Sequence, residues 1–456
     1  MAATKKYFGT DGIRGRAGEG KLSKISIAKL GLAIGHYLYR EGLGGTGGGN
    51  RTGSVVLGRD TRSSGLWIEK LLIKGLTAYG INVKNAGVLP TAATSFLTRC
   101  NDADMGIMIT ASHNPAHDNG LKLFGRSGRK LDDQTQLQIE AVITKNVNAP
   151  VDIKPGKVTD ITDSRDKYID AVMSSLLPEL NLDHLSVVLD CANGAAFETG
   201  PEILRRLGVK SLHVCGDQPD GANINLNCGS TNPERLCETV REHRADIGIA
   251  MDGDADRLIM CDENGDVLNG DQTMGALTLM WQIQGRLSRP GLVATVMSNL
   301  GLERMLGDNG LELIRTPVGD RHVAKAMQDG NYNLGGEQSG HMLMPDYLPT
   351  GDGMLAAIQL LSVLVTDGRK ASEALQVFAS VPQTLINVRY NGKSPLELEA
   401  VQDKVKAARA EFGDSGRVLI RASGTEPLIR IMTEGDDPKQ VVSIARSLAD
   451  FISGLS

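Results

Sequence analysis

Three short polar stretches of the chain carry side chains whose types and spacing could transfer a phosphoryl group. The first, "DGDADR" (252–257), places Asp252, Asp254 and Asp256 at alternate positions. In an extended loop, alternate side chains point the same way, so these three carboxylates can converge on one hard cation. Mg²⁺ is typically held by a few carboxylates together with phosphate oxygens. The stretch therefore predicts a magnesium site.

Two other interpretations of this acidic stretch are weaker. The spacing also fits a calcium loop that ends at Glu263, but Arg257 stands where that loop requires glycine. The preceding "ADIGIAM" is strand-like, whereas an EF-hand needs a helix there. A solvated acidic turn is the remaining alternative, and it would leave three close carboxylates repelling one another without a neutralising ion.

The second stretch, "TASHNPAHDNGLK" (110–122), follows the apolar run "MGIMI" and could present the Ser112 hydroxyl as a nucleophile. Serine carries a phosphoryl group covalently when a metal and cations stabilise the transferred group. An ordinary turn that ends at Asn114-Pro115 is the alternative.

The third stretch, "RASGTEPLIR" (421–430), predicts a turn between two strands. Backbone N–H groups in a turn of this composition can form an anion-binding nest, and guanidinium groups grip phosphate at two points. A plain hairpin is the alternative, although it would not need both Arg421 and Arg430. A nucleophile, a metal triad and a phosphate nest together indicate phosphoryl transfer, which depends mostly on positioning and charge neutralisation.

The elements expected to position these loops alternate between short valine- and isoleucine-rich runs and longer helix-like stretches, which predicts parallel α/β sheets. Ligands of such sheets bind outside the carboxyl ends of the strands. Three predicted strands end there in "TASHNP", "DGDADR" and "GEQSGH" (336–341). The run "DADMGIM" also resembles "RADIGIA", which indicates an internal repeat. We therefore expect three related domains whose loops share one cleft.

The predicted fold is α/β, with three related α/β domains of mixed, largely parallel sheets and a small C-terminal α+β domain. In that last domain, Ser394-Pro395 and Asp437-Pro438 should each open a helix, as cap and first residue. The expected domain ranges are 1–155 with the serine loop, 156–257 with the metal loop, 258–372 with the "GEQSGH" loop, and 373–456 with the phosphate loop.

Composition excludes several classes of protein. The net charge of −5 and the pI near 6.0 argue against nucleic-acid binding, which requires a basic face. The six cysteines show no zinc spacing or CxxC pair, which favours reduced thiols. The first residues contain no apolar signal segment, and no apolar run is long enough to cross a bilayer. We expect a cytoplasmic protein with no membrane partner.

The motifs "YFGTDGIRG" (7–15), "ASHNP…DNGLK", "LDCANGAA", "NINLNCGSTNPE" and "GGEQSGH" follow one another along the whole chain. Together they resemble the α-D-phosphohexomutase family, most closely its amino-sugar members. Two positions depart from the family pattern: Ala255 stands where glycine is common, and His322 stands where tyrosine is frequent. Both are side positions of their motifs.

The resemblance implies four domains around a central cleft, with Ser112 as a phosphoserine in the active enzyme. It also implies one Mg²⁺ ion held by Asp252, Asp254, Asp256 and a phosphoserine oxygen. The residues implied to bind the sugar are Glu337, Ser339 and His341, and those implied to bind the phosphate that is not reacting are Arg421, Ser423, Gly424, Thr425 and Arg430.

The implied substrate is a small phosphosugar. The phosphoserine would give its phosphoryl group to glucosamine 6-phosphate, and the 1,6-bisphosphate would reorient and return the other phosphate, leaving glucosamine 1-phosphate. Glucosamine 1,6-bisphosphate would then act as an activator, and the protein would be a monomer or a homodimer. A mutase for mannose or glucose phosphates, a non-catalytic sugar-phosphate sensor and a phosphatase are the alternatives.

The sequence offers more than one candidate for the general acid/base. Lys122 matches the family's lysine ten residues after the serine, but a lysine near its reference pKa is a poor base at neutral pH. The catalytic set therefore includes Arg14 and Arg257, which, together with Mg²⁺, would lower the pKa of Lys122 while the phosphate opposes them. His113 and His341 are alternative bases, or else orienting or core histidines.

Overall fold

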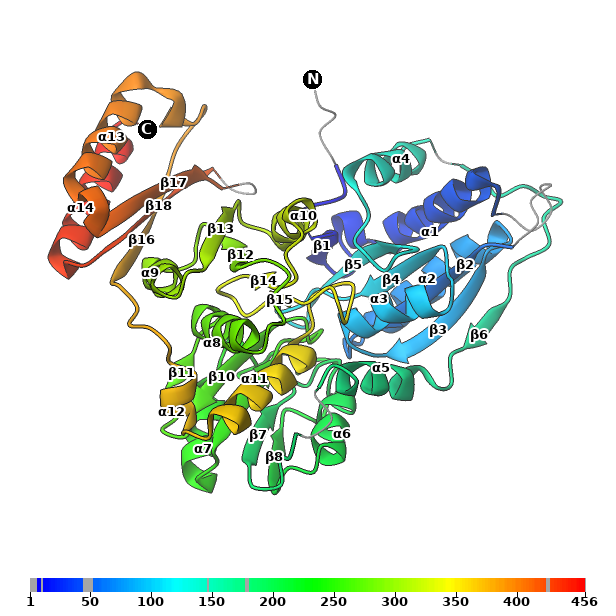
Figure 1. The fold of residues 1–456 in the computed structure, drawn as a ribbon. Helices are drawn as coiled ribbons and strands as arrows, with labels where there is room; N and C mark the ends of the chain where they lie inside the picture. Colours follow the sequence, from blue (N-terminus) through cyan, green and yellow to red (C-terminus); the bar gives the residue numbers. More distant parts are fainter. Residues whose placement is uncertain are drawn as a thin grey trace.

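The computed structural model describes residues 6–9, 11–43, 52–145, 147–176, 180–423 and 427–455. These residues form four lobes that follow one another along the chain (Figure 1). The glycine-rich tract 44–49, for which the sequence suggested no role, lies outside the described residues.

The first lobe contains a six-stranded mixed sheet in the order β1-β5-β4-β2-β3-β6. Its strands are β1 (Ile13–Arg16), β2 (Ser54–Arg59), β3 (Asn82–Val88), β4 (Met105–Ile109), β5 (Asp118–Gly125) and β6 (Val158–Asp160). The neighbouring pairs β4–β2, β2–β3 and β3–β6 are parallel. Strand β5 is antiparallel to both β4 and β1. β6 extends this sheet beyond residue 155, where the sequence suggested that the domain would end.

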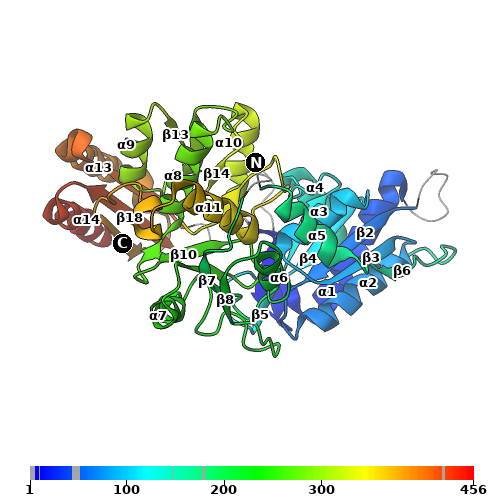
Figure 2. The ribbon, with the colours of Figure 1, turned by 60° about the horizontal axis from the view of Figure 1, so that its bottom comes forward.

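Helices lie on both sides of the first sheet, with α1 and α2 on one side and α3 and α5 on the other (Figure 2). The helices of this part of the chain are α1 (Lys24–Leu38), α2 (Gly65–Ala78), α3 (Thr91–Cys100), α4 (Asp133–Ile143) and α5 (Ser164–Met173). Short helical turns occur at Gly20–Leu22 and Tyr39–Leu43.

The second and third lobes repeat the mixed-sheet plan. The second sheet runs β11-β10-β9-β7-β8 and the third runs β13-β12-β14-β15. Their strands are β7 (Ser186–Asp190), β8 (Ser211–Cys215), β9 (Ile247–Met251), β10 (Leu258–Asp262), β11 (Val267–Leu268), β12 (Gly291–Thr295), β13 (Glu312–Thr316), β14 (Gly335–Gly336) and β15 (Met342–Leu343). Their helices are α6 (Thr199–Arg206), α7 (Glu234–His243), α8 (Gly270–Ile283), α9 (Leu300–Asp308), α10 (Asp320–Gly330), α11 (Gly353–Asp367) and α12 (Ala371–Ala374).

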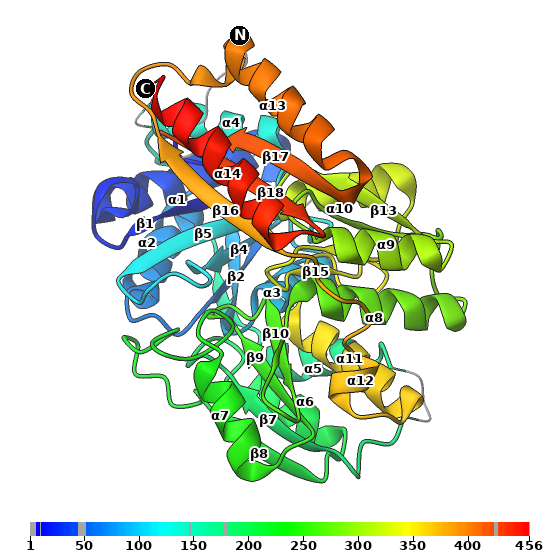
Figure 3. The ribbon, with the colours of Figure 1, turned by 90° about the vertical axis from the view of Figure 1, so that its left-hand side faces the viewer.

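The fourth lobe is an antiparallel sheet in the order β16-β18-β17 with two long helices over one face (Figure 3). Its elements are β16 (Gln383–Arg389), α13 (Glu399–Phe412), β17 (Gly416–Ala422), β18 (Leu428–Gly435) and α14 (Pro438–Ser453), with short turns at Pro395–Glu397 and Gly413–Ser415. The predicted fold class, three related α/β domains followed by an α+β domain, is confirmed.

The apolar core consists of separate clusters, and these clusters determine which lobes are fixed to one another. One large apolar cluster joins α3 and α5 of the first lobe to the second and third lobes, as far as Leu375. A separate cluster lies under α1, α2 and α4, and another belongs to the fourth lobe alone. The three lobes that carry the serine loop, the "DGDADR" loop and the "GEQSGH" loop are therefore fixed to one another by a shared core.

Two local predictions have different outcomes. Asp437 caps α14 by accepting from the Lys439 N–H at 2.8 Å, and Pro438 is its first residue, as expected. Ser394-Pro395 opens only a short 3₁₀ turn, after which α13 begins at Glu399 without a side-chain cap. The apolar stretch near residues 354–365 is the buried part of α11, and none of the helices in the described parts of the chain is long and apolar enough to cross a membrane.

Candidate active site

Ser112 lies in a rigid loop just after β4. Its φ of 54° is in the left-handed region, and its N–H donates to Thr110 Oγ1 at 2.8 Å. Its carbonyl oxygen accepts from Arg62 Nη2 and Asn225 Nδ2, each at 2.9 Å. Because the first of these donors belongs to the same lobe and the second to the next one, the serine is fixed between two lobes.

Arg62 is a scaffold residue that the sequence analysis missed. It is wholly buried, pairs with Asp60 at 2.9 Å, and also donates to the carbonyls of Asn114, Pro115 and Asp118. A single guanidinium therefore organises the whole serine loop. The strand end "GRDTR" offered a signal, since a charged pair after a buried strand needs a function or a partner.

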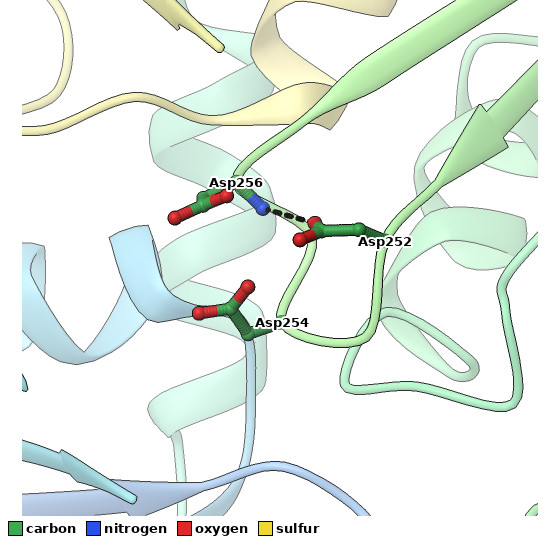
Figure 4. Close-up of side chains that lie close together, drawn as sticks. All are labelled: Asp252, Asp254 and Asp256. Carbon is green, nitrogen blue, oxygen red and sulfur yellow. Dashed lines mark hydrogen bonds between the residues drawn. The ribbon is translucent and has the colours of Figure 1, made fainter. Parts of the chain in front are cut away.

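The three aspartates of the metal loop converge as predicted (Figure 4). All are buried, and one carboxylate oxygen of each lies within 4.8 Å of the others. Ser112 Oγ donates to Asp252 Oδ2 at 2.6 Å, and Thr91 Oγ1 donates to Asp254 Oδ2 at 2.5 Å. The serine and the acidic triad, 140 residues apart in sequence, form one site.

The electrostatics of this triad fit a divalent cation. Burial, reinforced by Asp256 and Asp254, raises the pKa of Asp252 to about 8. Among the described residues, Asp254 Oδ1 and Asp256 Oδ1 are buried without a hydrogen-bond partner. Converging carboxylate oxygens with unsatisfied lone pairs are the hard ligands that Mg²⁺ prefers.

Lys122, on β5, contacts the same carboxylates. Its ammonium lies 2.7 Å from Asp254 Oδ2 and 2.5 Å from Asp256 Oδ2. Burial would lower the pKa of Lys122, but Asp11, Asp254 and Asp256 raise it well above its usual value. Arg14 lowers this pKa, as expected, but the three carboxylates outweigh its effect, so the net shift in this arrangement is upward.

The two histidines differ in charge. His113 Nδ1 lies 3.2 Å from Ser112 Oγ, and burial, with Arg257 and Arg14 nearby, lowers its pKa to about 4. His341 is buried between Asp256 and Asp320, with nitrogen–oxygen distances of 3.5 and 3.4 Å. Burial would lower its pKa, but these carboxylates raise it to about 10. At neutral pH, His113 is uncharged and His341 is a cation that cannot act as a base.

A cavity of about 380 Å³ adjoins this cluster. It is lined by Asp11, Arg14, Asp256, Arg257, Thr295, Met297, Val318, Gly319, Asp320, Glu337, Gln338, Ser339 and His341. Within the described residues, Arg14 Nε and Arg257 Nε are buried and have no hydrogen-bond partner. Glu337 Oε1 accepts from the Gly319 N–H at 3.1 Å. The cavity thus brings two cations with spare donors beside the triad and the "GEQSGH" loop.

The predicted phosphate residues lie apart from this cavity, in the fourth lobe. Arg421 on β17 stands directly opposite Arg430 on β18, and burial, together with Arg430, lowers the pKa of Arg421. The Ser423 N–H donates to the Leu428 carbonyl at 2.7 Å. Gly424 and Thr425 lie outside the described residues.

Asp11, Lys130 and Asp320 are further residues of the site that the sequence analysis did not select. The Lys130 ammonium bonds to Asp11 and, at 2.5 Å, to Asp320 Oδ2, while Asp11 also pairs with Arg14. These groups continue the ionic chain from His341 to the first lobe. Asp11 and Asp320 stand in the motifs "GTDGIRG" and "VGDRHV", which offered a signal, whereas Lys130 stands in no motif.

Comparisons with known proteins agree along the whole chain. Four models described as Phosphoglucomutase/phosphomannomutase match: alpha/beta/alpha domain I at residues 5–149, domain II at 166–265, domain III at 269–381 and the C-terminal domain at 385–451. A protein of Maricaulis maris (strain MCS10) named phosphoglucosamine mutase is 47% identical over 457 residues, covering 99% of this chain and 98% of that one. A protein of the same name from Ruegeria sp. (strain TM1040) is 48% identical over 452 residues, covering 99% of each.

Solved structures share the fold at lower identity. A phosphoglucomutase/phosphomannomutase family protein from Burkholderia thailandensis has a TM-score of 0.81 at 22% identity, covering 98% of this chain and 97% of that one. The N-acetylphosphoglucosamine mutase of Aspergillus fumigatus, in complex with GlcNAc-6P and magnesium, has a TM-score of 0.67 at 17% identity, covering 99% and 96%.

Proposed function

The chain belongs to the phosphoglucomutase/phosphomannomutase family, and from that premise we propose that it is a phosphoglucosamine mutase. It is an isomerase that interconverts glucosamine 6-phosphate and glucosamine 1-phosphate. The observation that carries the proposal is the 2.6 Å contact between the Ser112 hydroxyl and Asp252 inside a buried acidic triad. The names of the relatives, at 47–48% identity over nearly the full length, support the amino sugar as substrate.

Ser112 is the proposed phosphoryl carrier. Its left-handed backbone and the two donors on its carbonyl hold Oγ beside the triad. Asp252, Asp254 and Asp256, together with an oxygen of the phosphoserine, would hold Mg²⁺, which, when bound, neutralises charge on the transferring phosphoryl group. Preorganised charge of this kind is usually the largest contribution to such a reaction.

The cavity beside the acidic triad is the proposed sugar-phosphate site. The spare donors of Arg14 and Arg257 suit the oxygens of the phosphoryl group in transfer. Glu337, Ser339 and His341 would contact the sugar, since all three line the cavity. His341 would act as a cationic hydrogen-bond donor.

Lys122 is the proposed proton donor and acceptor for the sugar oxygen. The carboxylates around its ammonium keep it protonated, so it would give this proton to the sugar oxygen when that oxygen leaves the phosphoryl group that returns to Ser112. The neutral amine would then take the proton of the next sugar hydroxyl as that oxygen attacks the phosphoserine. The neutral His113 lies beside Ser112 Oγ and would orient that group.

Arg421, Ser423 and Arg430, with Gly424 and Thr425, form the proposed clamp for the phosphate that is not reacting. Two guanidinium groups directly opposite each other on neighbouring strands repel, so an anion between them is favoured. A mutase must hold each phosphate of its bisphosphate in turn, and glucosamine 1,6-bisphosphate is therefore the proposed activator. We expect a cytoplasmic monomer or homodimer that supplies amino-sugar nucleotide and cell-wall precursor synthesis.

Turnover of purified enzyme on glucosamine 6-phosphate, mannose 6-phosphate and glucose 6-phosphate tests this function directly. We expect the highest kcat/KM with glucosamine 6-phosphate. A higher value with either other sugar would favour a phosphomannomutase or phosphoglucomutase, with the same chemistry.

Replacement of the proposed carrier tests the covalent step. Ser112→Ala should abolish turnover and remove an adduct of about 80 Da, the mass of one phosphoryl group, from the intact mass. The fold should persist, because the bonds that hold this loop use the backbone of Ser112. Near-normal turnover by this variant would exclude a phosphoserine mechanism.

A further inference from the structure

Backbone contacts with several other segments hold the metal loop from outside. The Ala195 N–H donates to the Gly253 carbonyl at 2.8 Å, and the Gly353 N–H donates to the Ala255 carbonyl at 2.9 Å. At the end of the loop, the Leu258 N–H donates to the Gly340 carbonyl at 3.0 Å. The positions of the three carboxylates therefore depend on these segments as well as on the loop itself.

The segment at the start of α11 also approaches the metal loop closely. A Cβ atom added at Gly353 would lie 2.6 Å from both the Arg257 carbonyl oxygen and the Met251 sulfur. A Cβ atom added at Gly351 would lie 2.5 Å from His341 Nε2. Residues 351–353 thus contact the metal loop and the cationic histidine directly.

Asp352 lies between these two glycines and is itself buried, with 1% of its surface exposed. Its Oδ1 accepts from the Leu355 N–H at 2.7 Å and caps α11. Its Oδ2 accepts from the Tyr168 hydroxyl at 2.7 Å. Tyr168 is wholly buried on α5 and is not among the residues that line the cavity.

We propose that Tyr168 and Asp352 are a positioning pair for the metal loop. Their hydrogen bond fixes the first turn of α11, and the Gly353 N–H then fixes the loop that carries Asp252, Asp254 and Asp256. This inference rests on the proposed magnesium site and adds two residues, Tyr168 on α5 and Asp352 at the start of α11, to the set that determines its affinity. Groups that orient metal ligands from outside the coordination shell typically change metal affinity when they are removed.

The test is the binding of metal to unphosphorylated, metal-free enzyme, measured by calorimetric titration with Mg²⁺ and with Mn²⁺. Tyr168→Phe should weaken binding about tenfold, the lower end of the range for such indirect contacts. The matched control is Tyr79→Phe, which removes another buried tyrosine hydroxyl, bonded to the Asn148 carbonyl at 3.0 Å in the first lobe. The control should bind metal as the wild type does, and at saturating metal both variants should keep the wild-type KM for the sugar phosphate.

Replacements of Asp352 give an independent readout if Tyr168→Phe folds poorly. Asp352→Asn keeps a side-chain oxygen for the cap and an amide that can bond to the Tyr168 oxygen, so its metal affinity should stay close to that of the wild type. Asp352→Ala loses both contacts and should bind metal at least about tenfold more weakly than the wild type does.

Two negative outcomes separate the inference from the function on which it rests. If wild-type protein binds Mg²⁺ and Tyr168→Phe binds it as tightly as Tyr79→Phe does, the positioning pair is refuted while the proposed function stands. If wild-type protein binds no Mg²⁺ in the titration, the proposed metal site fails, and this inference fails with it.

Discussion

At the scale of single residues, Lys122 shows how one side chain can serve two purposes. Its ammonium lies between two carboxylates of the triad and offsets their repulsion. The same carboxylates raise its pKa, so the proton that it holds would be available for the sugar oxygen in the proposed mechanism. A metal ion that approaches Asp254 and Asp256 must share them with this ammonium.

This competition leads to a prediction for Lys122→Met. Turnover should fall at least about 100-fold, because the proton donor is lost. Metal affinity should be unchanged or higher, because Asp254 and Asp256 no longer neutralise an ammonium. Calorimetric titration with Mg²⁺ and steady-state turnover measure the two effects separately. A variant that loses metal affinity, or one that keeps turnover, would contradict these roles for Lys122.

The sequence identified those site residues that occur together in short motifs. Ser112 and the three aspartates lie at strand ends, where the alternation of strands and helices already predicts a ligand site. The pKa of Lys122 could not be predicted in the same way, because it depends on distances between β5 and a loop more than 130 residues away. Lys130 had no motif, and only the structure shows its ion pairs.

At the scale of elements, the pairing register of the β17–β18 hairpin in the fourth lobe determines how the two arginines of the proposed clamp are aligned. The antiparallel pairing that places Arg421 opposite Arg430 also aligns the apolar residues Ile420 and Ile431. Cross-strand neighbours lie on the same face of a sheet, so both guanidinium groups point to one side. The strands were predictable from their composition, whereas this register was not.

The proposed clamp predicts that its loss lowers kcat/KM by a factor that does not depend on the sugar. Arg421→Ala should cost about 1.5–3 kcal/mol for a lost charged hydrogen bond, or roughly 10- to 150-fold in kcat/KM for every phosphohexose. Added glucosamine 1,6-bisphosphate should partly restore turnover, because a weakened grip lets the intermediate escape. Arg389→Ala, an exposed arginine at the end of neighbouring β16, is the control and should behave as the wild type. Normal kcat/KM in Arg421→Ala would show that this loop is only a hairpin.

The cap of α11 makes a prediction about pH. Burial raises the pKa of Asp352 to about 6, above its usual value of 3.8. Since the folded state then holds the proton more tightly than the unfolded state, this group's contribution to stability falls as pH rises from about 4 to about 6, by up to about 3 kcal/mol. Asp352→Asn has no such ionisation. In thermal unfolding, its Tm should therefore rise relative to that of the wild type as the pH rises from about 4 to about 6. A constant difference in Tm between the two proteins would contradict the raised pKa.

At the scale of the whole molecule, an ionic chain crosses three lobes. It runs from Asp11 and Lys130 through Asp320 and His341 to Asp256. Breaking a buried ion pair by removing one partner is typically costly, so the first three lobes should move little against one another at this point. Their shared apolar core leads to the same expectation.

The fourth lobe is joined differently, and this difference predicts how the protein unfolds. Its core is its own, and it contacts the third lobe through polar groups: Arg304 pairs with Asp436 at 2.5 Å, and Arg417 donates to the Ser298 carbonyl at 2.7 Å. The Arg304–Asp436 pair is exposed, and such pairs contribute only about 0–1 kcal/mol. Scanning calorimetry of the unliganded enzyme should therefore show two transitions, one for the fourth lobe and one for the other three.

A bound sugar bisphosphate should change the separation between the two unfolding transitions. A sugar bisphosphate held at both the clamp and the cavity would stabilise the two units together by mass action, so the transitions should move closer at saturating glucosamine 1,6-bisphosphate. Arg421→Ala should reduce this shift, and Arg389→Ala should keep it. A single transition in the unliganded enzyme would mean that the polar contacts of Arg304 and Arg417 couple the lobes as strongly as a shared core does. Two transitions that ligand leaves unchanged would mean that the clamp and the cavity do not hold one molecule at the same time.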